Sequence, residues 1–165
     1  MHVDATEKKW LYISIAMAAF IIGLLTFYAV GKNLHPPSNV ETIDSERLHI
    51  EGEFVESNLG VKNMPDGSVE VRMVAARYGF YPQDVKIPAN TPVKFRIASA
   101  DVLHGFHVPY SNLATMVVPG YVSEVNTRFA DSSVGVHPMF CNEYCGLGHD
   151  HMWSKITIVA AGGGE

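Results

Sequence analysis

The most informative stretch of the chain reads Cys141-Asn142-Glu143-Tyr144-Cys145-Gly146-Leu147-Gly148-His149-Asp150-His151-Met152. It places two thiols, two imidazoles and a thioether in one short segment. Soft sulfur together with imidazole is the ligand set that copper prefers, and a thioether is a poor ligand for zinc. A mononuclear blue-copper loop needs one Cys followed by a His and a Met, which Cys145, His149 and Met152 supply. The second thiol, Cys141, predicts that two thiolates bridge two copper ions in a binuclear electron-transfer centre.

The two cysteines also admit other interpretations. In an oxidising compartment a Cys pair ordinarily forms a disulfide, and a thiol-redox copper chaperone can carry the same spacing. In thioredoxin-like chaperones, however, the pair lies early in the chain and a Pro follows it closely. Here the pair lies near the C-terminus, Gly146 follows it, and His149 and Met152 come next. This arrangement favours a metal centre over a disulfide.

A copper site of this type needs one more His from elsewhere in the fold. The upstream segment Asp101-Val102-Leu103-His104-Gly105-Phe106-His107-Val108 contains two. The spacing of the residues alone does not choose between His104 and His107.

The segments DVLHGFHVP (101–109) and CNEYCGLGHDHM (141–152) together resemble subunit II of the haem-copper cytochrome c oxidases. That family carries a binuclear copper centre, CuA, in a cupredoxin domain. The resemblance covers roughly residues 70–160 and one membrane helix, as in the shorter subunit II of the B-family oxidases. It implies the copper ligands His104, Cys141, Cys145, His149 and Met152, with the backbone carbonyl of Glu143 as a sixth.

The resemblance also implies a function. The CuA centre would accept electrons from cytochrome c, or from another soluble donor, and pass them to the haem of subunit I. That partner would reduce oxygen to water and pump protons. This chain would then be the electron-accepting subunit of an oxidoreductase, without an oxygen site of its own. Other small membrane subunits are further partners in such oxidases.

The resemblance also bears on residues around the implied centre. The family's aromatic residues in the stretch Arg77–Pro82 lie over the copper centre, which implies an electron-transfer or docking role for Tyr78 and Phe80. Packing in the core is the alternative for both rings. In the better-known oxidases the side chain matching Glu143 also reaches a magnesium ion, but one-helix relatives often lack it, so magnesium is not expected here. His107 is expected at the surface or beside the ligands rather than on the metal.

Two other functions fit the same residues. A CuA-containing nitric oxide reductase would use the same centre to feed a different catalytic subunit. A membrane-anchored copper-delivery protein would bind one labile ion and hand it on. The net charge of −5 over 165 residues is mild, and the chain has no basic patch or nucleic-acid-binding motif. Nucleic acid is therefore not an expected partner.

Residues 10–30 form an uncharged, apolar run, WLYISIAMAAFIIGLLTFYAV, of the length that a helix needs to cross a bilayer. A signal peptide is the alternative, but its apolar core is usually only ~7–15 residues long. The sequence therefore predicts a retained anchor over residues 1–31. Lys8 and Lys9 precede the run and only Lys32 follows it closely, so the N-terminus is expected in the cytoplasm. The copper domain would then lie on the outer face of a bacterial or archaeal plasma membrane.

After the anchor the pattern changes. Residues 32–68 are polar and weakly periodic, and they predict a linker that leads into the domain. Later runs alternate apolar with polar residues, are separated by turn residues, and include no amphipathic helix. These alternating runs are residues 69–76, 84–88, 91–97, 121–129 and 153–159.

This pattern predicts a mainly β fold. Short strands with frequent turns indicate an antiparallel β-sandwich or barrel over residues 69–160, followed by a disordered tail at 161–165. The resemblance implies that the domain is a cupredoxin-like Greek-key sandwich. Pro138 lies inside the strand expected before Cys141, and it puts the pairing of that strand in doubt because proline cannot donate to a ladder.

Overall fold

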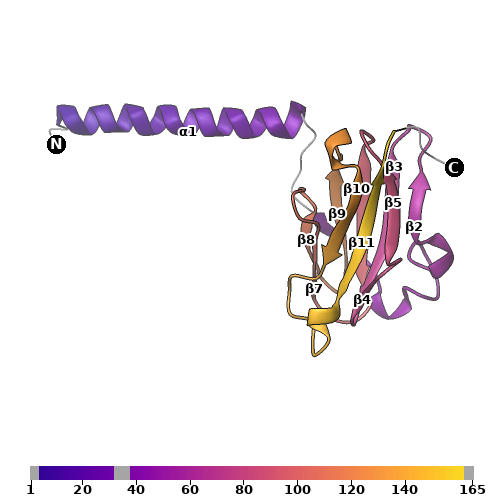
Figure 1. Cartoon of the computed structure of the whole chain (residues 1–165). Coiled ribbons are helices and arrows are strands. Elements are labelled where there is room, and N and C mark those ends of the chain that lie inside the picture. The colour runs from indigo at the N-terminus through magenta and orange to yellow at the C-terminus, as the bar shows by residue number, and fades with distance from the viewer. Residues whose placement is uncertain (1–3, 32–37, 162–165) are drawn as a thin grey trace. The chain divides into compact units, whose positions relative to one another are not determined.

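The computed structural model describes residues 4–31 and 38–161. The chain divides into two compact units, Met1–His35 and Pro36–Glu165 (Figure 1). The first contains one helix and the second is built from strands, so the predicted mainly β fold after a single N-terminal helix is confirmed. Apart from Ala161, the tail expected to be disordered lies outside the described residues.

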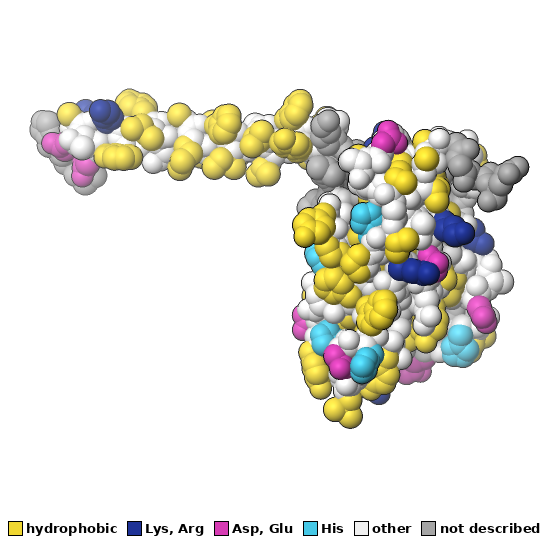
Figure 2. All heavy atoms as spheres, viewed as in Figure 1, with side chains coloured by type: hydrophobic (Ala, Val, Ile, Leu, Met, Phe, Trp, Pro, Cys, Tyr) yellow, Lys and Arg dark blue, Asp and Glu magenta, His cyan; other side chains and the backbone are white. Residues whose placement is uncertain are grey.

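The helix α1 spans Ala5–Gly31, and none of its residues is buried. Its 27 residues correspond to about 40 Å, more than the ~30 Å hydrocarbon core of a bilayer. Hydrophobic side chains cover it along its length, with charged side chains at its N-terminal end (Figure 2). By length and composition, α1 can cross a membrane.

The helix begins earlier than the apolar run because the residues before the run cap it. The carboxylate of Asp4 accepts a hydrogen bond from the backbone N–H of Thr6 at 2.7 Å. In return, the side chain of Glu7 accepts from the backbone N–H of Asp4 at 3.2 Å. This reciprocal pattern satisfies N–H groups at the start of a helix that have no partner inside it.

The second unit is a sandwich of two sheets (Figure 1). In the first sheet the order is β1-β9-β6-β3-β2, with β4 also paired to β3; in the second it is β5-β11-β10-β7-β8. The strands are β1 (Ser38–Thr42), β2 (Gly60–Asn63), β3 (Val69–Ala76), β4 (Gly79–Tyr81), β5 (Asp84–Pro88), β6 (Val93–Ser99), β7 (His104–His107), β8 (Ala114–Val117), β9 (Tyr121–Thr127), β10 (Gly135–Phe140) and β11 (Trp153–Val159). Four short 3₁₀ helices connect them: η1 (Ser45–Arg47), η2 (Glu56–Asn58), η3 (Asp131–Ser133) and η4 (His149–His151).

Two strand pairs are parallel, β3 with β6 and β5 with β11. The sequence predicted an antiparallel sandwich, and this detail is corrected by the structure. Between β3 and β6 the chain crosses to the other sheet, where it forms β5, and then returns to the first sheet in its original direction. Crossover connections of this kind make parallel neighbours, which a hairpin cannot make.

The side chains between the two sheets form one core. Phe106 packs edge-on against Phe80, with ring centroids 5.4 Å apart, and both are fully buried. Cys141, Cys145 and Met152 belong to the same apolar cluster. The three candidate sulfur ligands therefore extend the core of the sandwich.

Residues 38–63, which the sequence assigned to the linker, are built into this unit. β1 pairs with β9 at one edge of the first sheet, and β2 pairs with β3 at the other. Between them, Leu48 and Phe54 are buried in a second apolar cluster with Ala98 and Val122. The segment shows little periodicity because it meets the sheet through a few separated side chains.

Pro138 occupies a position in β10 where a missing N–H is tolerated. It pairs in register with Lys155 of β11. On the other side of β10, the pairing with β7 consists of the single pair Phe140 and His107. The doubt about this strand is therefore resolved, since Pro138 has no β7 residue opposite it that would need a ladder hydrogen bond.

Candidate metal centre

The candidate ligands come from β7 and from the loop between β10 and β11. His104 is the first residue of β7, Cys141 directly follows β10, and Met152 directly precedes β11. All six residues of β10 pair in register with the first six of β11, and the N–H of Cys141 donates to the carbonyl of Met152 at 3.0 Å. The loop is thus closed at its base by a regular ladder, which fixes where the remaining ligands can lie.

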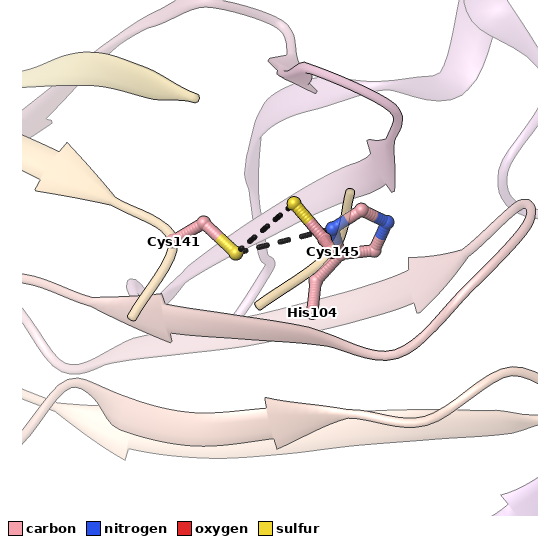
Figure 3. A group of neighbouring side chains, drawn as sticks. All are labelled: His104, Cys141 and Cys145. Atoms are coloured by element: carbon pink, nitrogen blue, oxygen red, sulfur yellow. Dashed lines mark hydrogen bonds between the residues drawn. The ribbon is translucent and has the colours of Figure 1, made fainter. Parts of the chain in front are cut away.

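The two thiols and one imidazole lie together (Figure 3). Ligand atoms of His104, Cys141 and Cys145 are all within 4.8 Å of one another, and all three residues are buried. The sulfurs of Cys141 and Cys145 are 3.8 Å apart, and Nδ1 of His104 is 4.0 Å from the Cys141 sulfur. Both cysteines are free thiols.

The other three predicted ligand atoms lie around the same pair of sulfurs. The carbonyl oxygen of Glu143 is 3.0 Å from the sulfur of Cys141. Nδ1 of His149 is 3.6 Å, and the thioether sulfur of Met152 3.5 Å, from the sulfur of Cys145. The structure therefore brings together all six atoms that the resemblance implies for the site.

Burial shapes the chemistry of the thiols. Cys141 and Cys145 are 6% and 5% exposed, and Met152 is 1% exposed. Burial, reinforced by the neighbouring thiol of Cys141, raises the pKa of Cys145 to about 11. In the absence of metal this thiol is therefore protonated at neutral pH, and a metal ion must displace its proton.

His104 is oriented by a residue that sequence reasoning did not single out. One carboxylate oxygen of Asp101 lies 2.8 Å from Nε2 of His104, which leaves Nδ1 facing the thiols. A carboxylate on the outer nitrogen of a ligating His fixes the ring and raises its basicity. The only signal in the sequence is the position of the acid three residues before His104.

The environment of Asp101 keeps it ionised. Burial alone would raise its pKa, but hydrogen bonds outweigh that effect and hold the pKa of Asp101 below its ordinary value. The hydrogen bonds come from His104 and from the backbone N–H groups of Val102 and Arg77, both at 2.7 Å. Asp101 is thus held as an anion beside the imidazole.

Gly105 makes room for the start of the loop. A Cβ at this position would lie 2.0 Å from the side-chain oxygen of Asn142 and 2.9 Å from the backbone N of Glu143. Any larger residue would push the backbone of Glu143, whose carbonyl lies beside the Cys141 sulfur. A glycine is therefore required next to His104.

The two aromatic residues expected near the electron path differ in position. Tyr78 is 45% exposed and its ring lies against the loop glycines Gly146 and Gly148. Phe80 is fully buried in the core between the sheets. Phe80 therefore occupies the core position that was the alternative expected for this ring, and it has no surface of its own.

The remaining histidines near the loop lie outside the cluster. His107 is half-buried and packs edge-on against Phe140, with ring centroids 5.1 Å apart. His151 is exposed and lies beside Asp150. Neither is among the residues that gather around the two sulfurs.

The donor set fits copper. Two thiols, two imidazole nitrogens, a thioether and one carbonyl form a soft, nitrogen- and sulfur-rich set, which suits copper and does not suit calcium or magnesium. The pair of sulfurs at the middle of the set offers the contact that two adjacent ions can share.

Comparisons with known proteins agree with this geometry. A family model described as the periplasmic domain of cytochrome c oxidase subunit II matches residues 60–160. Cytochrome c oxidase subunit 2 of Thermus thermophilus is 32% identical over 156 residues, which cover 93% of this chain and 92% of that protein. Heme-copper oxidase subunit 2 of Aeropyrum pernix is 32% identical over 73 residues, or 44% of this chain.

Solved structures share the fold. A chain of a heme-copper terminal oxidase dimer, determined by cryo-electron microscopy, superposes with a TM-score of 0.71 at 24% identity, over 93% of this chain and 99% of that one. The periplasmic domain of subunit II of cytochrome oxidase from Bradyrhizobium japonicum superposes with a TM-score of 0.50 at 19% identity, over 55% of this chain and 83% of that one. Taken with the family match and the identity to the Thermus protein, these observations show that the chain belongs to the cytochrome c oxidase subunit II family.

Proposed function

We propose that the chain holds a binuclear copper centre of the CuA type and serves as the electron-accepting subunit of a haem-copper oxidase. Membership of the family and the cluster of soft ligands support this proposal. The proposed ligands are His104, Cys141, Glu143 through its carbonyl, Cys145, His149 and Met152.

One observation carries the count of two ions. The six atoms divide into two similar sets around the pair of sulfurs, which are 3.8 Å apart. Beside the Cys141 sulfur lie one imidazole nitrogen and one weak donor, the carbonyl of Glu143. Beside the Cys145 sulfur lie one imidazole nitrogen and one weak donor, the thioether of Met152. Two equivalent sets with a shared sulfur pair are what two ions need, whereas one ion would leave half of the donors unused.

The chain's own residues prepare the centre for fast electron exchange. Bound copper supplies one-electron transfer. The loop is closed by the β10–β11 ladder, and Asp101 holds the ring of His104, so the ligands need little movement when the charge changes. The buried sulfurs and Met152 keep water away from the site. A rigid, dry ligand set lowers the reorganisation that each transfer requires.

Membership of the family supports a direction of electron flow. Electrons enter from cytochrome c or another soluble donor and leave to the haem of subunit I, where oxygen is reduced to water and protons are pumped. Other small membrane subunits complete such a complex. The apolar helix α1 supports a single-pass chain in a bacterial or archaeal plasma membrane, with the copper domain on the outer face.

Electron paramagnetic resonance of the full chain, purified in detergent and loaded with copper, tests the centre directly. An electron shared equally by two copper nuclei gives a seven-line hyperfine pattern, and we expect this pattern. A four-line pattern from one localised copper would contradict the proposal and favour a mononuclear carrier or a copper-delivery protein.

Single substitutions sharpen this test. Cys141→Ser and Cys145→Ser should each abolish the seven-line signal, because each removes one of the two sulfurs that the donor sets share. The matched control is His151→Gln, which changes an exposed imidazole in the same loop and should leave the signal intact. A signal retained in either serine variant would sink the assignment.

Oxygen consumption by the intact complex tests the acceptor. The complex should consume oxygen when it is given a reduced cytochrome c. Reduction of nitric oxide without oxygen consumption would instead make the chain the CuA subunit of a nitric oxide reductase.

A further inference from the structure

The turn between β3 and β4 consists of Arg77 and Tyr78, and its backbone is unusual. Tyr78 has a φ of 86°, in the left-handed region that favours glycine. Non-glycine residues are held in this region only where the surrounding structure imposes it, and such positions gather at functional sites. The turn therefore needs an explanation from its contacts.

The ring of Tyr78 lies directly against the loop between β10 and β11, which contains most of the proposed ligands. A Cβ built on Gly148 would be 2.3 Å from Cδ1 of this ring, and one built on Gly146 would be 3.6 Å from its hydroxyl. Gly146 follows Cys145 and Gly148 precedes His149. The absence of side chains at both glycines lets the backbone between two proposed ligands rest against the aromatic face.

The neighbouring residue, Arg77, is connected through Asp101 to His104, the other proposed imidazole ligand. The backbone N–H of Arg77 donates to Asp101 at 2.7 Å. The other oxygen of the same carboxylate lies 2.8 Å from Nε2 of His104. One hydrogen-bonded residue thus connects the turn to the His104 ring.

The turn stands on a rigid support. β3 and β4 pair in register from Val74 and Tyr81 to Ala76 and Gly79. Phe80 of β4 is fully buried in the core. The loop and this hairpin lie at the same end of the sandwich in Figure 1.

We infer that the Arg77–Tyr78 turn is a brace that positions both imidazoles of the copper centre. Tyr78 holds the Gly146–Gly148 backbone and hence His149, and Arg77 holds Asp101 and hence His104. This inference rests on the proposed function for the identity of the ligands. It gives Tyr78 a positioning role that operates without any donor protein and is separate from docking.

The brace is tested first in the metal-free full chain in detergent. Amide hydrogen exchange, followed by mass spectrometry, should be about tenfold faster over residues 146–149 in Tyr78→Ala than in the unchanged chain, because the loop loses its aromatic support. Tyr78→Phe retains the ring and should behave as the unchanged chain does. The matched control, Tyr81→Ala, removes a Tyr of equal exposure, 45%, from the same hairpin and should leave the exchange of these residues unchanged.

The copper-loaded chain gives a second readout, recorded with no donor protein present. Tyr78→Ala should change the copper hyperfine splitting and shift the reduction potential, and Tyr78→Phe should restore both. Gly148→Ala should produce the same changes from the opposite side, by driving a methyl group into the ring. This second variant decides the matter if Tyr78→Ala does not fold.

Two failures are distinguishable. Unchanged exchange, hyperfine splitting and potential in both Tyr78→Ala and Gly148→Ala would overturn the brace while the copper centre stands. A four-line signal in the unchanged chain would overturn the proposed function, and faster exchange in Tyr78→Ala would then still support a brace for the loop but not for a binuclear centre.

Discussion

At the scale of single residues, the thiol of Cys145 should make copper binding depend on pH. Burial, with the neighbouring Cys141 thiol, raises the pKa of Cys145 to about 11, so the metal-free site holds its proton throughout the neutral range. Metal binding must release that proton, and raising the pH makes the release easier. The apparent affinity for copper should therefore rise with pH, by up to about tenfold per pH unit for each proton released.

Competition with a copper chelator of known affinity, at several pH values between about 6 and 8, measures this dependence. Calorimetry in buffers of different ionisation enthalpy counts the released protons independently. An affinity that stays constant across this range, after correction for the chelator, would contradict the raised pKa of Cys145 in the metal-free chain.

Met152 should influence the reduction potential of the copper centre more than its affinity for copper. Its thioether is 1% exposed and lies 3.5 Å from the Cys145 sulfur. Met152→Leu conserves volume, so it should cost less than about 1.5 kcal/mol of folding free energy. We expect both coppers to be retained with a changed reduction potential, because a weak ligand sets potential more than affinity. Copper analysis together with redox titration measures the two effects; loss of copper would give Met152 a larger role.

The clustering of the proposed ligands was predictable from sequence where they follow one another in a short loop. A closed loop of this length brings its residues together whatever the rest of the fold is. The residues concerned are Cys141, Cys145, His149 and Met152. The roles proposed for Asp101 and Tyr78 could not be predicted in this way. That of Asp101 depends on one hydrogen bond to His104, and that of Tyr78 on one backbone angle. Neither quantity leaves a repeating pattern in the sequence.

At the scale of elements, an ion-pair network joins residues 41–53 of the β unit to strands β6 and β9 of the first sheet. Arg96 of β6 bonds Glu53 and Glu124 at 3.0 Å each and Glu41 at 2.9 Å. The side chain of Arg96 is only 13% exposed. The hydrogen bonding of Arg96 to the Glu53 carboxylate, which accepts, outweighs burial and raises the pKa of Arg96 further above its ordinary value. Arg96 is therefore a permanent cation among three carboxylates.

Arg96→Met should destabilise the β unit by about 2 kcal/mol, because it removes charge-assisted hydrogen bonds to the partly buried Glu53 and leaves it, among the described residues, only the longer contact to Arg72, at 3.7 Å. Denaturant unfolding followed by circular dichroism measures the loss. The matched control is Arg47→Met, which breaks an exposed pair with Glu51 and should cost less than about 1 kcal/mol. Equal effects of the two substitutions would mean that the network adds nothing beyond ordinary surface pairing.

The way in which each element packs explains whether its sequence predicted it. Strands such as β5 and β6 alternate clearly, because each lies on the core with one face. β1 and β2 are short, and the residues between them contact the sheet at isolated points such as Phe54. Such a segment is ordered by partners distant in the sequence, among them Arg96, and shows no periodicity of its own.

At the scale of the whole molecule, the charges around α1 predict its orientation. Lys8 and Lys9 lie near the start of the helix, and its last turn contains no basic residue. The N-terminus should therefore face the cytoplasm and the β unit the outside. Protease added to spheroplasts that express the chain should digest the β unit and spare an N-terminal tag. Digestion of the tag in intact spheroplasts would mean the opposite orientation.

The position of β1 has a mechanical consequence. This strand is the first of the β unit after the helix, and it is hydrogen-bonded on one side only, to β9. Tension applied through the anchor therefore enters the domain at a sheet edge. The proposed ligands belong to the other sheet, on β7 and between β10 and β11. Under such tension the hydrogen bonds between β1 and β9 would break first. The distances between the proposed ligands, which lie on the other sheet, would then stay unchanged.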